Sequence, residues 1–118
     1  MFEERLAGLA DRVEGTLAVS LVGRDGLVVQ SVTRGEHPDL ELLAAEIPER
    51  IRVLDRQVPE LESAAMRQLT VVSDRYTIML NAMSDNYFML LVLRESARLG
   101  RARYELRRSA LQFREDLD

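Results

Sequence analysis

Two short segments with apolar side chains at almost every position limit what this chain can fold into. Residues 16–22 read TLAVSLV, and residues 87–93 read YFMLLVL. Side chains of a strand alternate between the two faces of a sheet, so a strand that is apolar throughout must be covered on both faces. We therefore predict that these segments are central strands and candidates to lie side by side in one sheet.

Three further segments have the pattern of strands. Residues 27–32 follow the first strand through Arg24-Asp25-Gly26, a link typical of a type I turn with glycine in the left-handed conformation. This strand is more polar than residues 16–22, so we place it nearer an edge of the sheet. Residues 66–73 begin with polar side chains and alternate, which is typical of an edge strand. Residues 76–82 form the strand that precedes the turn into residues 87–93.

Three segments carry apolar side chains at helical spacing. The first spans residues 2–14, and the last begins near residue 99 and runs toward the end of the sequence. The middle one opens at His37-Pro38-Asp39, with proline in the first turn, and runs to about residue 58. Its apolar stripe consists of Leu40, Leu43, Ile47, Ile51, Leu54 and Val58. Pro48 lies inside this helix, so we expect a kink or a division into two helices.

Composition narrows the class of protein. The chain is 47% apolar and 31% charged, as in a soluble globular domain, and it has no cysteine. No apolar run is long enough to span a bilayer, and the N-terminus lacks the pattern of a signal peptide. We therefore expect a cytoplasmic protein without membrane insertion. The net charge of −4 argues against a nucleic-acid partner, which would require a basic surface.

No residues have the pattern of a catalytic, cofactor or metal site. His37 is the only histidine, and its place before a proline at a helix start is typical of a surface residue. The glycines match no phosphate-binding motif, and the serines no nucleophile elbow. We therefore predict that the chain is not an enzyme and uses no cofactor or metal.

The middle helix carries a second set of apolar side chains on the side away from its stripe. Leu42, Ala45 and Val53 fall roughly opposite the stripe at 100° per residue. Charged side chains lie between them, namely Glu49, Arg52 and Arg56. One interpretation is scattered surface residues, which are common. The other is a seam that is buried against a second copy or another protein, and we favour it.

The last helix has a basic outer face. Its arginines are Arg101, Arg103, Arg107 and Arg108. The default interpretation is a solvated surface on which Glu105 and Glu115 pair with these arginines. A docking site for an anionic partner is the alternative.

Two blocks of sequence carry a resemblance to a known family. Val13-Glu14-Gly15 leads into TLAVSLVGRDGLVVQS, and Leu99-Gly100 opens a helix that contains Glu105, Leu106 and the arginines at 103, 107 and 108. Together with the order of elements, these blocks resemble the roadblock / dynein light chain family. More narrowly, they resemble its bacterial branch, which includes the gliding-motility partner of a Ras-like GTPase. The resemblance covers residues 2 to about 115, and Pro48 departs from it.

The resemblance implies an α+β fold in which residues 1–118 form a single domain. It implies a five-stranded antiparallel sheet in the order 2-1-5-4-3, with the middle helix on one face and the first and last helices on the other. It also implies that two copies pair through the third strand and the middle helix. The residues assigned to the partner or dimer interface are Leu42, Ala45, Glu49, Arg52, Val53 and Arg56 on the helix, and Arg67, Leu69 and Val71 on the third strand.

Two functions from different classes follow. The first is a non-enzymatic homodimeric platform that binds and regulates a Ras-like small GTPase, either as an activator of hydrolysis or as a scaffold. The alternative is a small-ligand sensor with the layering of profilin or PAS domains. A sensor requires a polar-lined cavity in the sheet, and the strands show no buried polar cluster.

Overall fold

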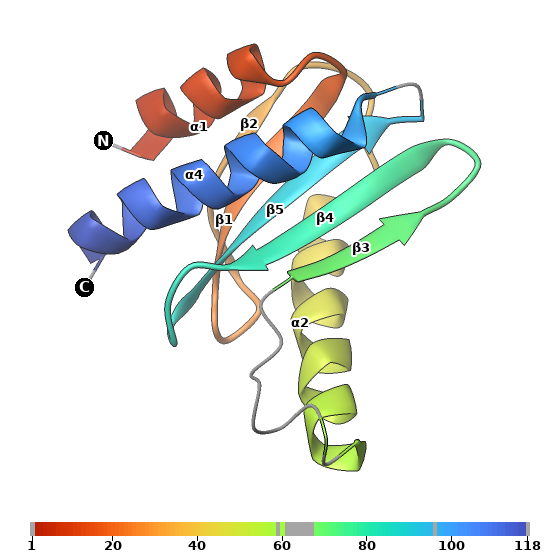
Figure 1. Ribbon diagram of the computed structural model, residues 1–118, viewed down its shortest axis with the longest axis vertical. Coiled ribbons are helices and arrows are strands. Elements are labelled where there is room, and N and C mark those ends of the chain that lie inside the picture. The colour runs from red at the N-terminus through yellow and green to blue at the C-terminus, as the bar shows by residue number, and fades with distance from the viewer. Residues whose placement is uncertain (1, 59, 61–67, 96, 118) are drawn as a thin grey trace.

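The computed structural model contains one five-stranded antiparallel sheet and describes residues 2–58, 60, 68–95 and 97–117 (Figure 1). The strands are β1 (Thr16–Gly23), β2 (Val28–Thr33), β3 (Gln68–Val72), β4 (Tyr76–Ala82) and β5 (Tyr87–Arg94). Their order is β2-β1-β5-β4-β3. The expected order is thus confirmed, with β1 and β5 paired at the centre and β2 and β3 at the edges.

Helices cover both faces of the sheet. Helices α1 (Phe2–Arg12) and α4 (Leu99–Leu117) lie side by side over one face, and α2 (Leu40–Gln57) lies on the other (Figure 1). The expected distribution of helices is therefore confirmed. In Figure 1 the C-terminal turns of α2 extend beyond the sheet.

The side chains of the central strands point alternately to the two faces of the sheet, so the molecule has one hydrophobic core on each face. Leu91 packs in the core beneath α1 and α4, whereas Leu90 and Val92 pack in the core that includes α2. All three side chains are fully buried. Burial of one such leucine contributes about 1.5–3 kcal/mol, which explains why apolar side chains occupy both faces of β5. Met79, Met83 and Met89 fill the first core.

Helix α2 is continuous through Pro48, so the alternative in which this proline divides the helix is wrong. Pro48 is buried beside Ala44, Ile47 and Ile51 on the face that packs on the sheet. A proline removes its own N–H donor and its ring crowds the carbonyl four residues earlier, but burial of this face holds the flanking turns together. The start of the helix also differs from the expectation, because Asp39 is the N-cap and accepts a hydrogen bond from the Leu42 N–H at 3.1 Å. Pro38 therefore precedes the cap.

The apolar stripe of α2 is covered only in part. Leu40, Ile47 and Ile51 are buried, but Leu54 is 39% exposed. Leu54 belongs to the end of the helix that extends beyond the sheet, so the expectation that it packs in the core is wrong.

Candidate functional site

A charged network occupies one flank of α2. Glu49 Oε2 accepts hydrogen bonds from the Arg52 guanidinium, with Nε at 3.1 Å and Nη2 at 3.0 Å. Arg56 Nη2 lies 3.7 Å from Glu49 Oε1. Residues three or four apart are neighbours on a helix surface, so Ala45, one turn before Glu49, extends the same flank. The structure therefore brings together four of the predicted interface residues.

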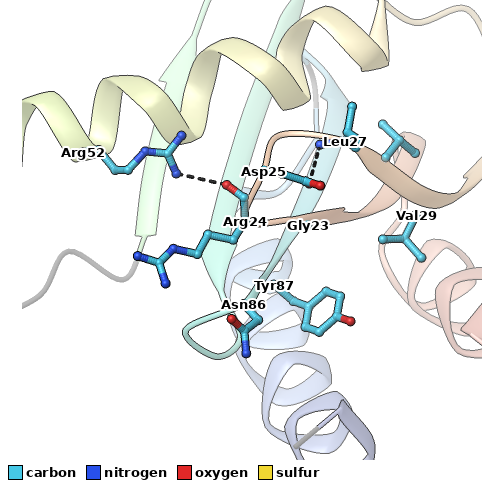
Figure 2. Close-up of a pocket in the computed structure, with 9 residues that line it drawn as sticks. Gly23, Arg24, Asp25, Leu27, Val29, Arg52, Asn86 and Tyr87 are labelled. Carbon is cyan, nitrogen blue, oxygen red and sulfur yellow. Dashed lines mark hydrogen bonds between the residues drawn. The ribbon is translucent and has the colours of Figure 1, made fainter.

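This flank of α2 faces the turn between β1 and β2. Arg52 Nη1 donates to the backbone carbonyl of Arg24 at 3.2 Å, so the helix and the turn are linked (Figure 2). Asp25 Oδ1 accepts from the Leu27 N–H at 3.1 Å, which closes the turn. A second turn supports it from the other side, because the Arg24 N–H donates to the carbonyl of Asn86 at 2.8 Å.

Gly26 allows this close approach. Its φ is +84°, the left-handed conformation that the sequence predicts for this position. A Cβ atom placed there would lie 3.2 Å from the Cα of Ala45 and 3.4 Å from the carbonyl oxygen of Ala44. The glycine thus lets the turn pack directly against the backbone of α2.

An open hollow of about 850 Å³ lies where the turn, α2 and the start of β5 meet. Leu27 and Val29 line it and are 67% and 51% exposed. Val29 is the extra residue of a β-bulge, because Leu21 pairs with Gln30 and Val22 with Val28. The hollow therefore combines exposed apolar side chains with the guanidinium groups of Arg24 and Arg52 (Figure 2). The sequence pattern placed Leu27 inside the strand of residues 27–32. It therefore did not reveal that exposed apolar side chains and arginines meet at this hollow.

The remaining predicted interface residues lie in two places. On α2, Leu42 is 57% exposed and Val53 is partly buried. On the edge strand β3, Leu69 is partly buried and Val71 is 43% exposed, while Arg67 lies outside the described residues. β3 pairs with β4 on one side only, so its other side carries backbone groups that none of the described strands pairs.

The outer face of α4 differs from the expectation at one residue. Glu105 is fully buried and does not belong to a solvated surface. Arg12 of α1 donates to its Oε2 at 2.8 Å, and Nη2 of Arg101 lies 3.4 Å from its Oε1. The side chain of Glu105 points toward α1, where Arg12 stabilises the buried carboxylate. Arg103 and Arg107 remain exposed.

The structure also places the residues that were considered for chemistry. His37 is exposed, and its Nδ1 lies 2.8 Å from the carbonyl of Pro38, as suits a surface residue at a helix start. Among the described residues, no group of three or more His, Cys, Asp or Glu side chains is placed to hold a metal ion. In the same part of the chain, no helix is both long and apolar enough to cross a membrane.

Known proteins resemble this chain in structure more than in sequence. No protein-family model and no curated protein matches the sequence significantly. Among solved structures, the chain is similar to MglC from Myxococcus xanthus, with 27% identity over 98% of both chains and a TM-score of 0.73. It is also similar to a Roadblock/LC7 domain from Streptomyces avermitilis, with 21% identity over 97% of this chain and 95% of that chain and a TM-score of 0.81. The chain has the roadblock/LC7 fold.

A third roadblock-type likeness is to the gliding protein MglB from Thermus thermophilus. It has 18% identity and a TM-score of 0.85 over 96% of this chain and 85% of that chain. The resemblance to the roadblock family and its gliding-motility branch is therefore confirmed. Profilin II from Acanthamoeba castellanii is a more distant likeness, with 15% identity, coverage of 97% and 94%, and a TM-score of 0.58. The layering is thus shared with profilin, but the roadblock fold describes this chain better.

Proposed function

We propose that this roadblock-type domain is a non-enzymatic, homodimeric platform that binds and regulates a Ras-like small GTPase in the cytoplasm. The observation that carries the proposal is the link between the charged flank of α2 and the β1–β2 turn. Arg52 joins the two through its hydrogen bond to the Arg24 carbonyl, beside the exposed side chains of Leu27 and Val29. Charged and apolar groups thereby form one surface.

The chemistry of this surface suits a specific but transient contact. Interfaces of this kind have an apolar centre and a polar rim. Leu27 and Val29 supply exposed apolar area, and the Glu49–Arg52–Arg56 network supplies charge next to it. Exposed charges raise the association rate and specificity more than the affinity. We therefore expect micromolar, salt-sensitive binding.

Self-association through β3 and α2 is the second part of the proposal. β3 is a terminal strand, and Val71 and Val72 on it are 43% and 67% exposed. An open edge with exposed apolar side chains invites pairing with another strand. Leu42 and Val53 on α2 would add apolar area to the same interface, as the sequence resemblance implies.

The platform would act without catalytic groups of its own. Arg52 is bonded to Glu49 and to the Arg24 carbonyl, so it supports the surface and is not poised as an inserted arginine finger. A binding partner shifts the equilibrium between two conformations of the GTPase only if it binds them with different affinities. Repositioning of the GTPase's own residues is therefore the route we propose for any effect on hydrolysis.

The experiment uses the Ras-like GTPases of the source organism, each immobilised and loaded with a non-hydrolysable GTP analogue. Arg56 is an exposed member of the network, and Arg56→Glu should weaken binding by about fivefold, the equivalent of roughly 1 kcal/mol. Arg98→Glu reverses an exposed arginine immediately before α4, away from this surface, and should leave the affinity unchanged. No binding by the unmodified protein would contradict the proposal.

A further inference from the structure

A second groove lies on the opposite face of the sheet, along the side of α4 that overhangs β4. One part, of about 280 Å³, is lined by Gln68, Asn81, Ala82, Met83, Arg107, Ala110 and Leu111. Another part, of about 570 Å³, lies over Gly100, Arg103, Tyr104, Arg107, Arg108 and Leu111. The second part is the outer surface of α4 itself. The two parts share Arg107 and Leu111, so they form one continuous surface, which we call the α4 groove.

The floor of the α4 groove contains a buried hydrogen-bond donor for which the described residues supply no acceptor. Gln68 Nε2 is buried and has no hydrogen-bond partner among the residues that the structure describes. The neighbouring Asn81 is 7% exposed, and its Nδ2 donates to the carbonyl of Ala82 at 3.2 Å. A buried donor without an acceptor costs about 1–3 kcal/mol. An acceptor brought by a ligand would remove that cost.

The wall of the α4 groove is positively charged. Arg103 and Arg107 are exposed, and no ion pair joins either of them to a described residue, whereas Arg101 and Arg108 both lie near Glu105. Among the described residues, no carboxylate lines either part of the groove. Guanidinium groups form their strongest hydrogen bonds with carboxylates and phosphates. The groove therefore favours an anionic acceptor.

Apolar side chains complete the α4 groove. Tyr104 and Leu111 are 59% and 63% exposed, among the most exposed large apolar side chains of the described residues. They are seven residues apart, which is two helical turns or about 10 Å, and so they lie on one side of α4. A ligand that covers both must present apolar groups about 10 Å apart, a spacing that an amphipathic helix provides two turns apart on one side.

We propose that the α4 groove docks an acidic amphipathic helix of a partner protein. A carboxylate of that helix enters the smaller part of the groove and accepts hydrogen bonds from Gln68 Nε2 and Arg107. Apolar side chains of the same helix cover Tyr104 and Leu111, as in other complexes of a helix in a groove. This inference goes beyond the proposed GTPase contact, because the groove and α2 lie on opposite faces of the sheet.

The charge on α1 favours a helix over a broad anionic surface such as a membrane. α1 lies beside α4 on the same face and carries exposed carboxylates at Glu3, Glu4 and Asp11. A flat anionic surface laid on this face would meet those carboxylates, and like charges repel. A single helix along the β4 side of α4 avoids them.

The test measures fluorescence anisotropy with a labelled peptide of about 16 residues, long enough for four helical turns. The peptide has leucine at helical spacing and glutamate at the other positions, and a matched peptide has lysine in place of every glutamate. The acidic peptide should bind at least about tenfold more tightly than the lysine peptide, a difference of roughly 1.4 kcal/mol. Arg107→Glu should remove most of that preference, and Gln68→Leu should weaken binding severalfold.

Arg50→Glu is the matched control, because Arg50 is an exposed arginine on α2. It should leave the peptide affinity unchanged, and backbone amide shifts on peptide addition should map to α4, β3 and β4. Three results would overturn the proposal: no binding, equal binding of the two peptides, or amide shifts confined to α2. Binding to phosphatidylglycerol vesicles without binding to the acidic peptide would also overturn it, in favour of a lipid surface. Each result is independent of GTPase binding.

Discussion

Arg12 Nε donates to Glu105 Oε2 at 2.8 Å and so connects α1 to α4 across 93 residues of sequence. The Glu105 side chain is only 1% exposed, whereas that of Arg12 is 38% exposed. Arg12 also donates to the Ser109 hydroxyl at 3.0 Å. One guanidinium on α1 thus satisfies two buried polar side chains on α4, and it fixes how the two helices lie together over the sheet.

Arg12→Ala should therefore destabilise the fold. The substitution leaves the Glu105 carboxylate buried without its best donor, which costs about 1–3 kcal/mol. Urea unfolding measures the change. Arg34→Ala is the control, because Arg34 and Asp11 form an ion pair between exposed side chains and such pairs contribute about 0–1 kcal/mol. Equal effects of the two substitutions would contradict the role given to Arg12.

Glu105 shows where sequence patterns reach their limit. Its position among arginines is typical of a solvated helix face, and helical spacing alone does not reveal that Arg12 of another helix meets it. The central strands were predictable because their burial does not depend on one partner side chain. Residues 87–93 are apolar throughout, and such a segment must be covered on both faces wherever it lies. The hollow beside Arg52 was not predictable, since it depends on the bulge at Val29 and on the approach of α2 to Gly26.

Gly26→Ala should separate the β1–β2 turn from α2. The substitution forces a side chain onto a residue with φ +84° and into the backbone of Ala45. A cost of about 1–3 kcal/mol is expected for strain of this kind. Gly100→Ala is the matched control. A Cβ at Gly100 meets nothing within 4 Å, and alanine is the better helix former. Thermal unfolding should show a lower Tm for the first variant and no loss for the second.

Val71→Asp should convert the proposed dimer to a monomer. Val71 lies on β3, the edge strand through which two copies are proposed to pair. A charge there would be buried without a partner in the dimer. Light scattering should give twice 13.5 kDa for the unmodified protein and 13.5 kDa for the variant. Val29→Asp introduces the same charge on the other edge strand and should remain a dimer. An unmodified protein that stays monomeric at high concentration would contradict pairing through β3.

Leu27→Asp should weaken GTPase binding without affecting the fold. Leu27 is 67% exposed in the β1–β2 turn, so the substitution removes apolar contact area and little packing. Loss of an exposed contact of this size corresponds to roughly a fivefold to thirtyfold change in affinity. Unchanged affinity, with the same Tm as the unmodified protein, would show that the turn lies outside the contact.

The central claim is that the platform distinguishes the nucleotide state of a Ras-like GTPase. The most direct measurement is titration calorimetry of this protein against the Ras-like GTPases of the source organism, each loaded either with GDP or with a non-hydrolysable GTP analogue. We predict micromolar binding that is at least about tenfold tighter for the GTP-analogue form, because differential affinity is what allows a platform without catalytic groups to regulate its partner. Equal affinity for the two forms, or no binding to either, would contradict the account.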